Sequence, residues 1–110
     1  MRPVSVGTIL TQASKQTVYK VPVGYYAHWN LAYAVNNSGQ NKYIDILWYD
    51  ASTNIEMSVI YHYVLSPSQF VKLDGAAYVV LEEGDEVRAL SEAGSTMSVI
   101  NTFELYRNKG

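Results

Sequence analysis

The stretch YAHWNLAYAV, Tyr26 to Val35, decides the fold class because its side chains alternate in character. In a β-strand, successive side chains point to opposite faces. One face of this stretch would carry Ala27, Trp29, Leu31, Tyr33 and Val35, and the other Tyr26, His28, Asn30, Ala32 and Ala34. Alternation of this kind predicts a strand rather than a helix.

The next run, KYIDILWYD, repeats the pattern, with Ile44, Ile46 and Trp48 on one side. Between the two runs lies NNSGQN, which is rich in turn residues. We therefore expect a β-hairpin from about Tyr26 to Tyr49. Asn36-Asn37-Ser38 also fits the N-glycosylation pattern, but the pattern is short, and we interpret NNSG as a turn.

Further short strands are expected along the chain, and no segment predicts a helix. They cover residues 6–10, 17–21, 55–64, 70–73, 77–81, 86–90 and 96–106, with a turn at Asp74 and a break at Pro67. About eight strands at this spacing predict an all-β fold, a single antiparallel β-sandwich that is jelly-roll-like. The expected domain is 1–110, with an N-terminal arm (1–5) and a short C-terminal tail (108–110).

The amino-acid composition argues against catalysis, metal binding and phosphate binding. The chain of 110 residues has no cysteine, two histidines and a net charge of −2 with 16% charged residues. His28 and His62 stand apart in the sequence, and no H-x-H, G-x-S-x-G or phosphate-binding glycine motif is present. We therefore expect no enzyme activity, no cofactor, no metal site and no nucleic-acid partner. No apolar run reaches the roughly 20 residues of a membrane helix.

The acidic segment VVLEEGDEVRAL, Val79 to Leu90, is the strongest candidate for carboxylate chemistry. It concentrates Glu82, Glu83, Asp85 and Glu86 within five positions. Gly84-Asp85 is favourable hairpin-turn chemistry because glycine accepts a positive φ. Adjacent Glu82 and Glu83 would point to opposite faces, and the spacing of a calcium loop is absent. We interpret the segment as a turn whose carboxylates form a solvated rim.

Tyrosine is abundant, at ten residues. Tyrosine is enriched in protein interfaces, because its ring is apolar and its hydroxyl still forms hydrogen bonds, but it is also a good strand former. Both explanations stay open. In the segment YHY, Tyr61 and Tyr63 would share one face and His62 the other. The interface candidates are Tyr61, His62, Tyr63, Tyr25, Tyr26, Arg2 and Val4.

The order of several motifs resembles a group of small β-sandwich virion proteins of tailed bacteriophages. The motifs are TVYKVPVGYYA (17–27), NNSG (36–39), QFVKLDG (69–75), VVLEEGDEVRA (79–89) and NTFEL (101–105). Val23 departs from the pattern, which has a small residue there. The resemblance implies a non-enzymatic structural protein located in the virion, as capsid decoration or cement, or as a head–tail or tail-adaptor component. Its expected partners are other virion proteins, including copies of itself.

Two other functions compete with this one. A carbohydrate-binding module for host-surface glycans would use Trp29, Trp48, Tyr25, Tyr26 or Tyr49 as stacking platforms, although the two tryptophans lie on the more apolar faces of their strands. A single-stranded nucleic-acid binder would also use aromatic platforms, but the net charge of −2 argues against it.

Overall fold

Eight strands make up the fold. The structure, a computed structural model, describes residues 1–108, and all of their side chains except those of residues 75–78. The strands are β1 (Arg2–Leu10), β2 (Gln16–Lys20), β3 (Tyr25–Asn36), β4 (Lys42–Asp50), β5 (Ile55–Leu65), β6 (Phe70–Leu81), β7 (Glu86–Ser91) and β8 (Met97–Arg107). No helix occurs in the described chain, so the predicted all-β class is confirmed.

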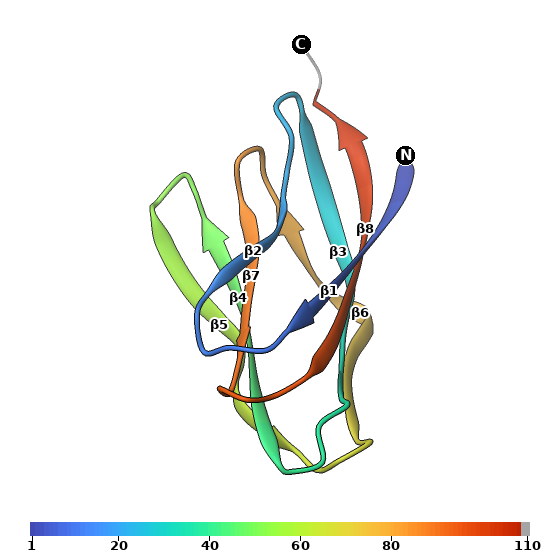
Figure 1. Cartoon of the computed structure of the whole chain (residues 1–110). Coiled ribbons are helices and arrows are strands. Elements are labelled where there is room, and N and C mark those ends of the chain that lie inside the picture. Colours follow the sequence, from blue (N-terminus) through green and yellow to red (C-terminus); the bar gives the residue numbers. More distant parts are fainter. Residues whose placement is uncertain (109–110) are drawn as a thin grey trace.

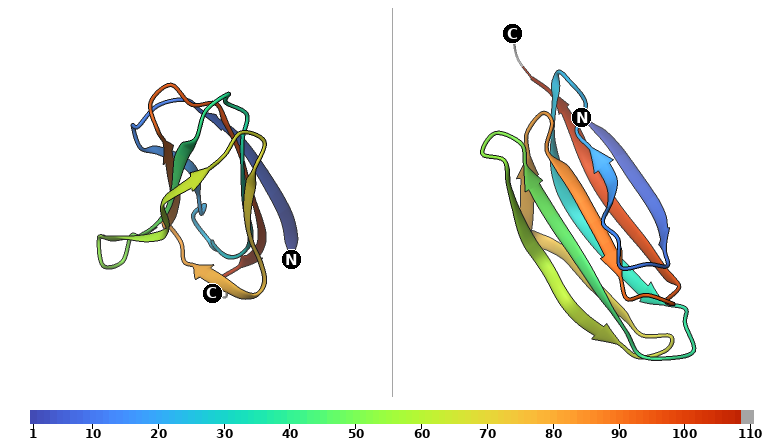
Figure 2. Two further views of the ribbon diagram at one scale, coloured as in Figure 1. Left: turned by 90° about the horizontal axis from the view of Figure 1, so that it is seen from below. Right: turned by 60° about the vertical axis from the view of Figure 1, so that its left-hand side comes forward.

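The strands form two antiparallel sheets that pack face to face (Figure 1). One has the order β1-β8-β3-β6 and the other β2-β7-β4-β5. Only the β4–β5 connection joins neighbours within a sheet, and every other connection crosses from one sheet to the other. This order is that of a jelly roll. The right-hand view of Figure 2 shows β1 and β5 on opposite long sides of the sandwich.

Two expected hairpins are therefore wrong. The strands β3 and β4 form well but lie in different sheets, so the segment 37–41 crosses the sandwich instead of closing a hairpin. The same holds for β6 and β7 at the acidic turn. Turn residues predict where the chain reverses, but they do not decide whether the flanking strands pair with each other or face each other across a core. The predicted turn at Asp74 does not separate two strands, because β6 spans Phe70 to Leu81, but the pairing with β3 is interrupted there and passes from Asp74 opposite Leu31 to Val79 opposite Trp29.

The core lies between the sheets. Alternation in residues 96–106 predicts that every second residue from Met97 to Leu105 shares one face of the last strand, and the structure confirms this face. Met97, Val99, Asn101, Phe103 and Leu105 of β8 are all buried. The face predicted to hold Ala27, Trp29 and Leu31 is buried from Ala27 to Trp29, but the prediction is wrong for the residues that follow. Asn30 is an extra residue in the pairing with β8, a β-bulge, after which the buried side chains are those of Ala32, Ala34 and Asn36. Leu31, Tyr33 and Val35 are consequently half-buried on the outer face.

Three of the buried polar side chains form hydrogen bonds that hold distant segments of the chain together around this core. Asn36 donates from Nδ2 to the carbonyls of Gln40 and Leu65 at 2.8 Å each, which ties the β3–β4 crossing to the end of β5. Because Asn36 is fully buried, the glycosylation pattern there is inaccessible. Asn101 accepts from Trp29 Nε1 at 3.0 Å. The third is Asp85, in the acidic turn.

Asp85 corrects the interpretation of the acidic turn as a solvated rim. Gly84 has the expected positive φ of 85°, and Glu82 and Glu83 are exposed. Asp85, however, is only 1% exposed. Its carboxylate accepts from Trp48 Nε1 at 3.1 Å, from the amide of Ala51 at 3.0 Å and from the amide of Glu82 at 3.0 Å. The turn is thus anchored to the β4–β5 hairpin.

The expected N-terminal arm is also corrected. Residues 2–5 belong to β1 and pair with β8, from Arg2 opposite Leu105 to Ser5 opposite Thr102. The apolar side chain of Val4 packs against the core, which explains why the strand starts earlier than its sequence pattern indicates. In the expected tail, the Asn108 amide donates to the Gly24 carbonyl at 2.8 Å, and residues 109–110 lie outside the described residues.

We predict that Asp85→Ala lowers the free energy of unfolding by about 3 kcal/mol, because it leaves buried donors without an acceptor. The matched change Glu82→Gln in the same turn should cost less than about 0.5 kcal/mol, because that side chain is exposed. Urea unfolding at neutral pH measures both. Equal losses in the two variants would contradict the anchoring role of Asp85.

Candidate functional site

No three histidine, aspartate or glutamate side chains come close enough to hold a metal ion among the described residues. His28 and His62 lie on β3 and β5, which belong to different sheets. No helix in residues 1–108 is long and apolar enough to span a membrane. The candidate functional regions are therefore the outer surfaces of the sandwich.

The outer face of the β2-β7-β4-β5 sheet carries an ion-pair network centred on Arg88. Its guanidinium contacts Glu86 Oε1 and Glu56 Oε2 at 3.0 Å each and lies 4.0 Å from the centre of the Tyr49 ring. Lys15 contacts Glu56 at 2.6 Å, and Thr17 donates to Glu86 at 2.7 Å. Because these charges are paired within the chain, this part of the face offers little to a partner.

The network shifts the titration of its members. The hydrogen bond from Thr17, more than the neighbouring Arg88, holds the pKa of Glu86 below its usual range. The hydrogen bond from Lys15, followed by that from Arg88, does the same to the pKa of Glu56. The hydrogen bonds to Glu86 and Glu56 raise the pKa of Arg88. Glu86 is therefore part of the network and not of a solvated rim.

The YHY segment forms a stacked aromatic cluster with Tyr43, toward the end of the β4–β5 pair that is opposite Tyr49 and Glu56. The His62 ring lies 4.2 Å from the Tyr43 ring and 4.2 Å from the Tyr61 ring, in near-parallel stacks. His62 Nδ1 lies 2.9 Å from Oδ1 of Asp45, whose carboxylate is 4% exposed and also accepts from the His62 amide. The expectation that His62 and Tyr61 point to opposite faces is wrong. His62 has a positive φ of 47°, and β5 carries extra residues opposite β4 at this point.

The other predicted interface residues divide into two groups. Tyr61 and Tyr63 are 68% and 52% exposed, and Arg2 is exposed. Tyr26 stacks on Tyr106 on the outer face of the β1-β8-β3-β6 sheet. Val4 and Tyr25, in contrast, pack partly buried against the core, so part of their role is within the subunit. The sequence pattern did not separate these groups, because the exposure of a half-apolar strand depends on its neighbours.

Sequence reasoning missed Asp45, Asp85, Asn36 and Asn101. Asp45 carried a signal, because a single charge inside the apolar run IDILW needs a partner when the strand is buried. Asn101 also carried one, because alternation places it on the otherwise apolar face of the last strand. Asn36 and Asp85 gave none, because asparagine and aspartate beside turns are common whether or not they are buried.

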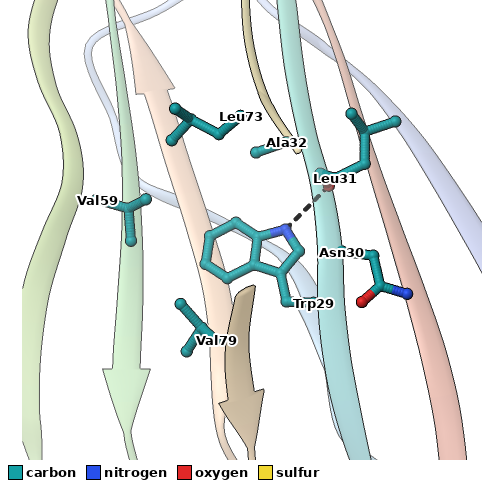
Figure 3. A pocket seen from close by; sticks show the side chains of 7 residues that line it. All are labelled: Trp29, Asn30, Leu31, Ala32, Val59, Leu73 and Val79. Carbon is teal, nitrogen blue, oxygen red and sulfur yellow. Dashed lines mark hydrogen bonds between the residues drawn. The ribbon is translucent and has the colours of Figure 1, made fainter. Parts of the chain in front are cut away.

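The two tryptophans do not form stacking platforms for a sugar. Trp29 is 5% exposed, and Trp48 packs against the core with its Nε1 bonded to Asp85. A cavity of about 40 Å³ lies beside the Trp29 ring, bordered by Val59, Leu73 and Val79 (Figure 3). Ligand pockets have volumes of roughly 300–1,000 Å³, so this cavity is too small for a sugar ring.

Exposed apolar side chains concentrate on the free edges of one long side of the sandwich. Twelve large hydrophobic side chains of the described residues are exposed, and eight of them lie on β5 and β6. They are Ile55, Met57, Tyr61, Tyr63, Val64, Phe70, Leu73 and Val80. Both strands are edges of their sheets. Apolar groups on an unpaired edge favour association with another chain, so we name this region the β5–β6 edge surface.

Comparison with known proteins identifies the fold but no family. No family model matches the chain, and no curated protein matches it in sequence. A solved structure of Bacillus endospore appendages, which form disulfide-linked pili, is similar with a TM-score of 0.52 and 16% identity, over 97% of this chain and 89% of that one. The nucleoplasmin-like N-terminal domain of Drosophila FKBP39 gives 0.50 and 13%, over 98% and 94%.

A pentameric capsid protein from metagenomic phage sequences is a weaker structural neighbour. Its TM-score is 0.41 at 16% identity, over 87% of this chain and 59% of that one. At this level the likeness has no bearing on function. The comparisons therefore support a β-sandwich fold and leave the function to be argued from the surface.

The pKa shifts of the Arg88 network predict an acid-dependent contribution to stability. A carboxylate whose pKa is lowered by folding stabilises the fold above its unfolded pKa, and this is lost as pH falls through the folded value. We expect Glu56→Gln/Glu86→Gln to be less stable than the original chain by about 1–2 kcal/mol at pH 7. The difference should shrink as pH falls from 7 to below about 4, the usual pKa of a glutamate, because the folded-state pKa of each carboxyl is lower still.

Urea unfolding across this pH range, with Glu82→Gln as the control, measures the effect. A difference that stays constant with pH would show that the glutamates act through packing and not through their charge.

Proposed function

We propose that this chain is a non-enzymatic structural subunit of a tailed-bacteriophage virion, in the class of capsid decoration, head–tail or tail-adaptor proteins. The motif order from residue 17 to residue 105 supports the family, and the jelly-roll topology agrees with the β-sandwich that the resemblance implies. In this proposal the protein is located in the virion and binds other virion proteins, including copies of itself.

The observation that carries the proposal is the β5–β6 edge surface. A free edge strand presents unpaired backbone groups, and soluble proteins usually protect such edges with charged side chains. On β5 the one charged side chain, Glu56, is already paired with Lys15 and Arg88. The exposed side chains that remain on β5 are mostly apolar or aromatic, with Tyr61 and Tyr63 the largest. Such a surface is suited to burial against another protein.

The tyrosines suit this role because each can bury a ring and still use its hydroxyl. A tyrosine buries roughly 150–250 Å² at an interface. The stack on His62 fixes the Tyr61 ring before any partner arrives, because His62 is itself tied to buried Asp45. A side chain that is already ordered loses less conformational entropy on binding.

The carbohydrate alternative loses its two tryptophan platforms in the folded chain, since Trp29 is buried in the core and Trp48 is partly buried against it. Tyr49 is covered by the Arg88 guanidinium, 4.0 Å from the ring centre. A glycan array probed with the purified chain tests that alternative directly.

We predict that the purified chain forms multimers and that Tyr61→Ser/Tyr63→Ser weakens them about 10-fold to 100-fold, because aromatic anchors dominate interface energies. The melting temperature should change little, since both side chains are exposed. Sedimentation velocity over a concentration series measures the association. Val23→Ser is the matched control, because Val23 is 85% exposed in the turn before β3.

A purified chain that stays monomeric at every concentration, and is absent from the protein inventory of the particle that encodes it, would overturn the proposed function. An equal loss of association in the Val23 control would show that the two tyrosines have no special part.

A further inference from the structure

We propose that a hollow at one end of the sandwich binds an oxyanion, meaning a phosphate or carboxylate group, between two arginine side chains. The hollow measures about 250 Å³ and is lined by Met1, Arg2, Tyr25, Leu105 and Arg107. We name it the Arg2–Arg107 hollow. It belongs to a single chain, so the inference goes beyond the proposed function and does not depend on it.

Strand pairing places the two arginines on the same face of the β1-β8-β3-β6 sheet. Arg2 of β1 is opposite Leu105 of β8, and residues that are directly opposite each other share a face. Arg107 follows Leu105 by two residues on the same strand, so it also shares that face. The Cβ atoms of diagonal neighbours such as Arg2 and Arg107 lie about 7–8 Å apart. Two side chains as long as arginine can therefore reach one anion between them.

This face of the sheet packs against the core elsewhere along its length. Leu105 is 3% exposed, whereas Arg2 and Arg107 are exposed, so the sheet extends beyond the core at this end. The start of β1 and the end of β8 lie together there (Figure 1). Burial raises the pKa of the Tyr19 hydroxyl, and the nearby positive charge of Arg2 opposes that rise. The Arg2 guanidinium therefore lies at the rim of the core.

The acidic side chains at this end of the sheet lie on its opposite, outer face. Glu82 and Glu83 line a separate hollow there. Glu104 also lies on the outer face, because it directly precedes Leu105 on β8. Among the described side chains, no carboxylate forms an ion pair with either guanidinium of the Arg2–Arg107 hollow. Two like charges are thus held near each other without a counter-charge, which is unfavourable in the free chain.

Arg88 shows how this chain compensates an arginine with a structural role. Its guanidinium contacts Glu86 and Glu56 at 3.0 Å each. Arg107, by contrast, lies beside the Tyr25 ring, with its guanidinium carbon 5.9 Å from the ring centre. A contact of this kind uses the face of the guanidinium and leaves its N–H donors available. These donors favour a ligand that accepts hydrogen bonds and carries negative charge.

An oxyanion suits this arrangement better than a simple halide does. The planar guanidinium fork matches two oxygens of a carboxylate or phosphate and forms charge-assisted hydrogen bonds with them. A water molecule takes up about 30 Å³ in the liquid, so a hollow of about 250 Å³ admits such a group with part of its hydration. A free phosphate ion and an acidic side chain of another protein both supply this chemistry, and the experiment distinguishes them.

A phosphate titration of the whole chain, followed by NMR, tests the site. Below about 0.1 M ionic strength the Debye length exceeds about 10 Å, so exposed charges still act at this range. Added inorganic phosphate should shift the Nε–Hε signals of Arg2 and Arg107 until they saturate. The Arg88 signal should stay in place, because its donors are already paired. Sodium chloride at equal ionic strength is the reference, and sodium acetate offers a carboxylate in place of phosphate.

Three variants provide the second readout. Arg2→Gln and Arg107→Gln should each weaken phosphate binding about 10-fold, because each removes one charged fork. Arg107→Lys should also weaken it, since lysine keeps the charge but loses the fork. The matched control Lys72→Gln removes the same charge from a side chain on β6 that pairs with Asp74, and it should leave binding unchanged. Circular dichroism confirms folding, and if Arg2→Gln disturbs β1, Arg107→Gln at the last residue of β8 decides the matter.

Saturation by phosphate that both glutamine variants lose and Lys72→Gln keeps would support the site. Acetate that competes with phosphate would show that the site also takes a carboxylate, such as an acidic side chain, and acetate without effect would assign it to phosphate. Shifts that chloride reproduces without saturation would show screening alone and overturn the inference. A loss in Lys72→Gln as large as in the arginine variants would overturn it too. None of these results depends on whether the chain forms multimers, so the site and the proposed function can fail separately.

Discussion

The burial of one apolar layer between two four-stranded sheets is the interaction on which the rest of the structure depends. Only β4 and β5 pair directly after one another in the sequence, so neither sheet can form from local contacts alone. A connection that crosses between the sheets contributes to stability only when both sheets pack against the same core. Folds dominated by such non-local contacts fold slowly compared with helical proteins, and their stability rests on cooperative packing. Phe103 is central to that packing, because it is fully buried and stacks on Tyr19.

Buried polar groups then decide how the crossings are held. Asn36 and Asp85 each sit where the chain passes from one sheet to the other, and each bonds to backbone groups of a distant segment. An unsatisfied backbone amide or carbonyl is costly in an apolar interior. These side chains supply the partners that regular pairing cannot supply at the ends of the strands. They also explain why the acidic turn contains one buried carboxylate with a structural role, Asp85, beside the exposed carboxylates of Glu82 and Glu83.

The surface is divided in a way that bears on function. The ion pairs around Arg88 satisfy one outer region within the chain, whereas β5 and β6 expose apolar and aromatic groups at free edges. Arg2 and Arg107 lie in one hollow with Tyr25 and Leu105, whereas Glu82 and Glu83 lie in another with Tyr26 and Val80.

The sequence by itself determined the strands, because alternation is a local property of the backbone, and it located the turns and the inner face of β8. Tertiary structure alone decided which strands pair, because turn residues such as Gly84 serve hairpins and sheet crossings equally. It decided which side chains face outward after Asn30 and around His62, because one extra residue in a strand reverses every later side chain. It decided that Asp85 is buried while Glu82 is exposed, since burial depends on the Trp48 and Ala51 groups that only folding brings near.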